Sequence, residues 1–233
     1  MLSWAVQPAL ADNPCQDLPD HTTLTRALKQ AVAVGDPKFN GGLALNMWAT
    51  VVARDGTVCA VTFTGPGWGD QWPGSRVISA QKANTANAFS LPQLAISTAN
   101  LYSAVQGGGS LFGLQLSNPV DPAVAYAGTA SQFGQPDDPL VGKRLGGINV
   151  FGGGLALYTA SRKLVGGLGV SGDTSCTDHH VAWKTRQALA LDHVPAGVNK
   201  KGSPAKGNDN IIYDMVDGKS ASGFGHPDCG MGE

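Results

Sequence analysis

The sequence predicts an α+β fold in which helices pack on one antiparallel sheet of about five strands. Two patterns carry this prediction. Segments with helical spacing of apolar residues alternate with short apolar segments rich in β-branched residues, and consecutive strand segments are joined by tight turns. Strands joined by tight turns run antiparallel, so helices are left to cover the sheet. The strands are too few and too locally connected for a doubly wound parallel fold.

The first half of the chain predicts a helix, a hairpin and two more helices. Apolar residues recur at helical spacing over residues 22–34. The hairpin has strands over residues 43–54 and 57–63, separated by the tight-turn dipeptide Asp55-Gly56. The two further helices are expected over 75–89 and 93–105.

The second half begins with a long connection over residues 106–144 that shows only turn chemistry. Connections of this length are usually functional or involved in subunit contact. Three short strands are expected over 148–151, 155–160 and 164–171, followed by a last helix over 177–191.

The domain is expected to span residues 12–195. Residues 1–11 end in Ala9-Leu10-Ala11, a small-x-small pattern typical of the end of a signal peptide, and we interpret them as its remnant. The alternative is an ordinary terminal tail. Residues 196–233 are rich in Gly, Lys and Asn and predict an irregular C-terminal extension. The expected location is periplasmic or secreted.

Four widely spaced cysteines support an exported chain: Cys15, Cys59, Cys176 and Cys229. They show no C-x-x-C spacing, and an even count in an exported protein favours disulfides. Three pairings are open. Two of the cysteines lie in irregular terminal segments, so the simplest pairing ties each terminus to the body, Cys15 to Cys59 and Cys176 to Cys229.

Composition excludes several classes of function. Charged residues make up 14% of the 233 residues, and the formal net charge is −1. No stripe of Lys and Arg with interleaved aromatic residues follows the chain, so no nucleic-acid partner is expected. No apolar run approaches the roughly 20 residues that a membrane span requires. The chain also lacks the G-x-S-x-G motif of a nucleophile elbow, and it shows no recognisable catalytic triad.

Three segments resemble a known family. Residues 80–89, AQKANTANAF, are similar to a helix of the GlcG/HbpS-like haem-binding family. Residues 152–157, GGGLAL, and residues 164–172, LVGGLGVSG, are similar to two of its strands, and Asp178 stands where the family has an acidic residue. The resemblance covers roughly residues 22–192.

The resemblance implies an α+β fold and assembly into a homo-oligomer. Some members of the family bind haem and are linked to haem degradation or to signalling through a partner sensor. Others occur beside glycolate or diol metabolism. Haem is therefore the expected cofactor, and a small molecule or tetrapyrrole is the expected ligand.

Candidate ligand-binding residues follow from the resembling helix. Lys82 and Thr85 are three residues apart and share a helix face, on which Lys82 would pair with a ligand carboxylate such as a haem propionate. Phe89 ends the same segment. Trp72, in a glycine-rich loop, would stack on a planar ligand or cover the sheet. The alternative is that Lys82 is solvated and that Thr85 only packs or caps.

The segment from Ser171 to Ser175, which includes Asp173, leads from a strand into a helix N-terminus. Free N–H groups at such a terminus favour anions, so the segment would hold a carboxylate or phosphate. The alternative is a capping loop in which Thr177 or Asp178 satisfies the first turn.

His179 and His180 are the candidate metal or haem-iron ligands. Adjacent helical residues point about 100° apart, so the two imidazoles cannot share one small metal site. A capping or surface role is the alternative for each, and Cys176 cannot be a ligand once it is oxidised.

These observations predict an exported ligand-binding protein for haem or a related tetrapyrrole. A second hypothesis is an enzyme or accessory subunit that acts on a small hydroxy acid or aldehyde and uses the loop from Ser171 to Ser175 as an anion cradle. A third is a structural or interaction oligomer that assembles through the long central loop.

Overall fold

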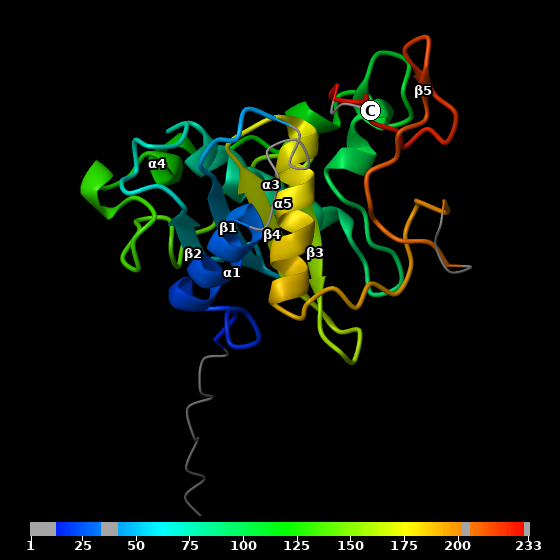
Figure 1. Ribbon diagram of the computed structural model, residues 1–233. Coiled ribbons are helices and arrows are strands. Elements are labelled where there is room, and N and C mark those ends of the chain that lie inside the picture. Colours follow the sequence, from blue (N-terminus) through cyan, green and yellow to red (C-terminus); the bar gives the residue numbers. More distant parts are fainter. Residues whose placement is uncertain (1–12, 34–41, 202–205, 231–233) are drawn as a thin grey trace, which may run out of the picture.

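The computed structural model describes residues 13–33, 42–201 and 206–230, so the expected signal-peptide remnant, residues 1–11, lies outside the described residues. One sheet organises the fold (Figure 1). Its four strands are β1 (Trp48–Ala53), β2 (Val58–Phe63), β3 (Gly154–Tyr158) and β4 (Leu164–Ser171). They lie in the order β2-β1-β4-β3, and every neighbouring pair is antiparallel. The predicted α+β class and its antiparallel sheet are thus confirmed.

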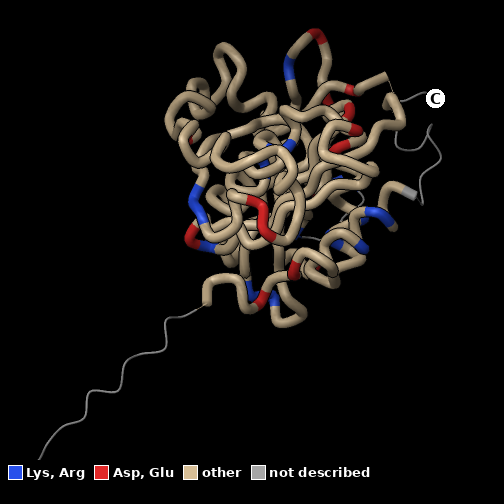
Figure 2. Tube along the Cα trace, turned by 90° about the vertical axis from the view of Figure 1, so that its left-hand side faces the viewer, with Lys and Arg blue, Asp and Glu red and all other residues tan. Residues whose placement is uncertain are grey.

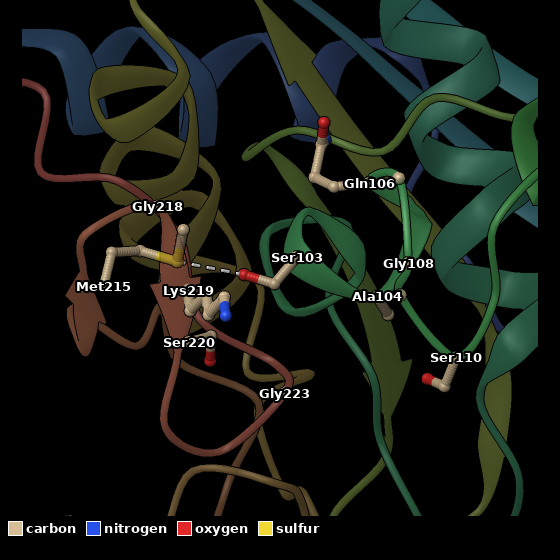
Figure 3. A pocket seen from close by; sticks show the side chains of 12 residues that line it. Ser103, Ala104, Gln106, Gly108, Ser110, Met215, Gly218, Lys219, Ser220 and Gly223 are labelled. Atoms are coloured by element: carbon tan, nitrogen blue, oxygen red, sulfur yellow. Dashed lines mark hydrogen bonds between the residues drawn. The ribbon is translucent and has the colours of Figure 1, made fainter.

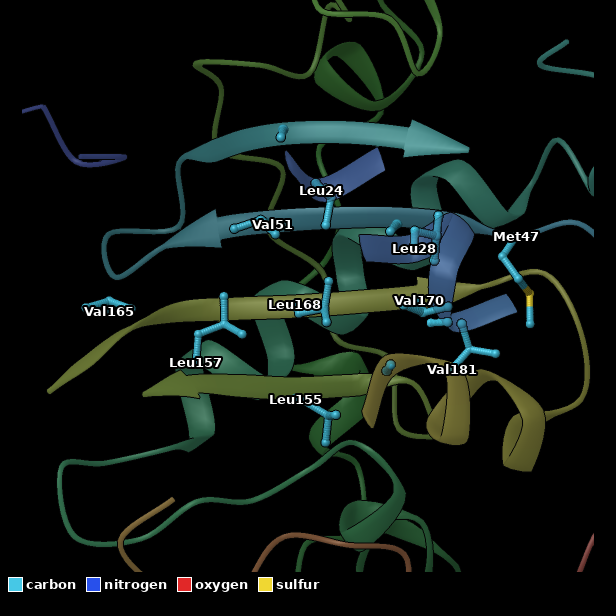
Figure 4. Close-up of a cluster of buried hydrophobic side chains, with 14 residues drawn as sticks. Leu24, Leu28, Met47, Val51, Leu155, Leu157, Val165, Leu168, Val170 and Val181 are labelled. Carbon is cyan, nitrogen blue, oxygen red and sulfur yellow. The ribbon is translucent and has the colours of Figure 1, made fainter. Parts of the chain in front are cut away.

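Helices cover both faces of this sheet. Helix α1 (His21–Ala33) and helix α5 (Ser175–Ala188) pack on one face, and helix α3 (Ser75–Phe89) packs on the other. Figure 4 shows Leu24 and Leu28 of α1 and Val181 of α5 meeting the side chains of the strands. A short helix, α4 (Pro122–Ala125), lies in the long connection and contributes to the core on the α3 side.

Glycines let α3 lie directly against the sheet. A Cβ atom added at Gly169 would overlap the carbonyl oxygen of Ser79, and one added at Gly167 would overlap the carbonyl oxygen of Ala83. Gly154 of β3 faces the carbonyl oxygen of Lys82 in the same way. Because these strand positions carry no side chains, the backbone of α3 packs directly against the backbone of the sheet.

The predictions for two elements are wrong. Residues 93–105 form no α-helix but two 3₁₀ turns, Ala99–Leu101 and Ser103–Val105. The reason is that Ala95 is extended and its N–H donates to the carbonyl of Ala196, far along the chain. Residues 148–151 form no strand, which leaves four strands in the sheet.

The described residues of the C-terminal extension contain a small hairpin. Its strands are β5 (Met215–Val216) and β6 (Lys219–Ser220). The structure contains the disulfides Cys15–Cys59 and Cys176–Cys229, which are the two pairs that the sequence favoured. Each joins a terminal segment to an element of the domain.

Most of the chain is uncharged. Figure 2 shows the Lys, Arg, Asp and Glu positions as short coloured segments along a mostly uncharged trace. In the part of the chain that the structure describes, no helix is both long and apolar enough to cross a membrane.

Gly169→Ala tests the close packing of α3 on the glycine positions of the sheet. The added methyl group meets backbone on α3, so we expect a loss of about 1–3 kcal/mol in the free energy of unfolding, as for overpacked cores. Urea denaturation measures the loss. Gly69→Ala is the matched control because nothing lies within 4 Å of a Cβ atom at that position. Equal stability of the two variants would contradict the close approach of α3.

Candidate functional site

A buried ion pair joins α3 to α5 at the end of strand β4. The Nζ atom of Lys82 lies 2.6 Å from Oδ2 of Asp178 and donates a second hydrogen bond of 3.1 Å to the carbonyl oxygen of Val170. Both charged side chains are fully buried. The ring of Phe151 lies 4.1 Å from the ammonium group, which adds a cation–π contact. The ammonium group is thus neither solvated nor unpaired: its partner is a carboxylate of the same chain.

Asp178 also occupies the expected anion cradle. Its Oδ1 atom accepts the backbone N–H groups of Gly172 (3.0 Å) and Asp173 (2.9 Å). The helix is capped by Thr174, whose hydroxyl accepts the N–H of Thr177, so the capping residue is neither Thr177 nor Asp178. The loop therefore places its free N–H groups as predicted, but on an internal carboxylate.

The other polar residues of this loop also have partners within the chain. The carboxylate of Asp173 accepts the N–H groups of Leu43 and Leu45, at 2.9–3.1 Å, which fixes the segment that leads into β1. The hydroxyl of Ser171 donates to Ser75 Oγ at 3.2 Å.

Burial dominates the electrostatics of the ion pair. Desolvation raises the pKa of Asp178 to about 6, although the positive charge of Lys82 opposes the shift. The same desolvation lowers the pKa of Lys82. Each charge is therefore maintained by its partner, and neither could keep its charge alone at this depth.

Three other predicted ligand residues do not meet in one described cavity. The hydroxyl of Thr85 is buried, donates to the carbonyl of Gln81 at 2.7 Å and accepts the N–H of Asn149 at 2.9 Å. Phe89 is half-buried at the end of α3. The ring of Trp72 is 49% exposed, on the loop before α3.

His179 is fully buried against the C-terminal extension. Its Nε2 atom lies 3.1 Å from both Oδ1 of Asn210 and the backbone nitrogen of Ile211, and its ring stacks on Trp183. Burial lowers the pKa of His179 to about 3, so the imidazole is neutral. Its Nε2 atom is therefore engaged by the extension, whereas Nδ1 is buried without a hydrogen-bond partner.

His180 points away from His179, and two residues that the sequence analysis did not select lie near it on α5. Trp183 and Lys184 follow it by three and four positions, so the three side chains are neighbours, and all are half-buried. Burial, together with the charge of Lys184, lowers the pKa of His180. The i, i+3, i+4 spacing was the signal in the sequence that could have identified this group.

A polar pocket lies elsewhere, between the triple glycine and the C-terminal hairpin. Its volume is about 550 Å³, and Figure 3 shows Ser103 and Gln106 on one side and Met215 and Lys219 on the other. Glycines and serines dominate its lining, whereas tetrapyrrole sites are mostly apolar. The pocket therefore does not suit haem.

Asp178→Asn tests the buried pair. The change leaves an uncompensated ammonium group, so we expect a loss of about 3–5 kcal/mol in the free energy of unfolding. The control, Arg144→Ala, removes the exposed ion pair with Asp55 and should cost about 0–1 kcal/mol. Denaturant titration at pH 7 compares them. The account fails if Asp178→Asn is no less stable than the control variant.

The depressed pKa of His179 predicts a pH dependence. Because its pKa of about 3 lies below the ordinary value of 6.5, neutral His179 stabilises the fold above pH 6.5, and this contribution is lost as the pH falls towards 3. Asp178 acts in the opposite direction because its pKa is raised. We therefore compare the wild type with His179→Gln, which lacks only the first contribution. The free energy of unfolding should fall more steeply in the wild type between pH 6.5 and 3, and parallel curves would contradict this.

Comparisons with known proteins agree with this architecture. A family model described as haem degrading protein HbpS-like matches residues 25–187. A crystal structure of a PduOC–haem complex is similar, with a TM-score of 0.51 and 22% identity over 80% of this chain and 99% of that one. Identity at this level shows the fold alone.

Two further crystal structures are similar. The Klebsiella pneumoniae protein ORFY has a TM-score of 0.46 and 21% identity, covering 82% of this chain and 98% of that one. HbpS has a TM-score of 0.44 and 18% identity, covering 80% of this chain and 99% of that one. No curated protein sequence matches the chain. Because the family model spans well over half of the sequence, the protein belongs to the HbpS-like family.

Proposed function

We propose that this chain is an exported protein that binds haem or a related tetrapyrrole. The family match over residues 25–187 is the observation that carries the proposal, because that family is described as haem degrading. The similar PduOC structure was determined with haem, which supports the same ligand class.

The residues first predicted to line the site do not fit haem. A propionate group needs a cation that is free to pair with it, and the ammonium group of Lys82 is already paired with Asp178. The N–H groups of Gly172 and Asp173 donate to the same carboxylate. This cluster therefore supports the fold around the ligand site and does not contact the ligand. Because Asp178 already accepts the N–H groups of this loop, no observation favours the hypothesis of an enzyme that acts on a hydroxy acid.

His180, on α5, is the iron ligand that we propose. His180 offers a neutral imidazole, the form that coordinates iron, because burial lowers its pKa. Trp183 lies one turn further along the helix, where its ring contacts His179 and lies 4.7 Å from the guanidinium carbon of Arg186. Lys184 adds a positive charge to the same half-buried part of α5. All three residues lie inside the matched segment. Bound haem would supply an iron centre whose reactivity depends on its axial ligand.

Export and assembly are further parts of the proposal. Two disulfides support an oxidising compartment. Assembly into a homo-oligomer is supported by apolar side chains in the long connection, where Phe112 is 70% exposed and Leu116 is 81% exposed.

Titration with haemin tests the ligand and the proposed iron ligand. We expect the wild type to shift the Soret band at micromolar haemin. His180→Ala should change the band position and weaken binding by about tenfold or more, which corresponds to about 1.4 kcal/mol. The matched control is His193→Ala, because His193 is exposed, and it should titrate like the wild type.

The two parts of this proposal can fail separately. Absence of any spectral change with the wild type would overturn haem binding. A wild-type titration curve for His180→Ala, alongside one for His193→Ala, would overturn only the choice of iron ligand.

A further inference from the structure

The C-terminal extension is attached to the start of α5 by a cluster of sulfur and nitrogen atoms. The disulfide Cys176–Cys229 links the two segments. Beside it, the imidazole of His226 contacts the hydroxyl of Ser175 at 2.7 Å. One ligand atom from each of Cys176, Cys229 and His226 lies within 4.8 Å of the other two. Cys176 and His226 are buried, and Cys229 is half-buried.

The hydrogen bonds of His226 determine which nitrogen faces this cluster. Its Nδ1 atom lies 2.7 Å from the carbonyl oxygen of Pro227, which can only accept, so Nδ1 carries the proton. The Nε2 atom therefore carries a lone pair and no proton, and it accepts the hydrogen bond of the Ser175 hydroxyl. A carbonyl that holds the opposite N–H in this way is the usual outer-shell support of a metal-binding histidine.

We propose that the reduced form of this disulfide is a binding site for a thiophilic divalent ion such as Zn²⁺, with Cys176, Cys229 and His226 as ligands. Two thiolates and one imidazole are three of the four ligands of a tetrahedral zinc site. Water or the hydroxyl of Ser175 completes the coordination. The sulfur–sulfur bond has to be broken and the two sulfur atoms have to separate before both can bind one ion.

The chemistry balances with an external reductant. A phosphine or dithiol donates two electrons to the Cys176–Cys229 bond, the sulfur–sulfur bond breaks, and each sulfur takes up one proton while the reductant is oxidised. Binding of the ion then releases both thiol protons, because the thiolate is the ligand. The ion thus replaces a covalent link with a coordinate link between the same two segments.

The cluster is specific to one of the two disulfides. In residues 13–33, 42–201 and 206–230, no other group of three His, Cys, Asp or Glu side chains meets the same distance limit. The disulfide Cys15–Cys59 therefore has no third ligand and is a natural comparison. His226 and Cys229 lie beyond residue 187, outside the segment that the family model matches.

Co²⁺ is the spectroscopic probe for this site. The full chain is reduced with a phosphine under anaerobic conditions, the reductant is removed, and Co²⁺ is added. We expect one tetrahedral Co²⁺ per chain, with visible d–d bands and a thiolate-to-cobalt charge-transfer band, and Zn²⁺ should displace it. The oxidised chain should show neither band. Reduced wild type without these bands would overturn the proposal.

Variants separate this site from ordinary thiol binding. The double variant Cys15→Ser, Cys59→Ser should keep the full signal, and Cys176→Ser, Cys229→Ser should lose it. His226→Gln keeps all four thiols and should weaken Co²⁺ binding by more than the about 10–100-fold that loss of an outer-shell partner costs. Circular dichroism confirms that each reduced variant is folded. Binding by His226→Gln that equals the wild type, or a signal that follows Cys15 and Cys59, would overturn the assignment.

Discussion

The position of Lys82 opposite Asp178 is the constraint on which the arrangement of helices depends. The ammonium group comes from α3 and the carboxylate from α5, on opposite faces of the sheet, and they meet where β4 ends. Gly153 leaves room beside them: a Cβ atom there would lie 2.3 Å from the carbonyl oxygen of Val170, 3.0 Å from the Asp178 Cβ and 3.1 Å from the Lys82 nitrogen. Bare backbone before β3 thus leaves space for a charge pair, and the attraction between the two charges and their hydrogen bonds offset the cost of burying them.

Local patterns were sufficient for the elements whose partners are close in the chain. The hairpin around Asp55-Gly56 and helix α3 follow from turn chemistry and spacing, and both form where expected. The helix predicted over residues 93–105 does not form, because Ala95 is held in an extended conformation by its pairing with Gly197, which is distant in the chain. For the site, the sequence indicated Lys82, but its partner lies 96 residues away and spacing cannot reveal it.

The extension beyond the matched segment is built into the fold through α5. Arg186 forms a buried bidentate ion pair with Asp209, with nitrogen–oxygen distances of 2.7 and 2.8 Å. It also donates a hydrogen bond to the carbonyl of Ala156. His179 contacts Asn210 about two turns earlier on the helix. Since buried polar groups need all of their partners at once, this part of the chain and α5 specify each other's position.

The strand order has a consequence for the growing polypeptide. Strands β1 and β2 pair with each other as soon as residue 63 has emerged, but the other edge of β1 is completed only by β4, residues 164–171. For about a hundred residues of synthesis the ribosome therefore carries a hairpin whose β1 edge is unsatisfied, and open edges of this kind recruit strands from neighbouring chains. A nascent chain of this topology gains most from a chaperone or from dilution while the long central connection is still being made.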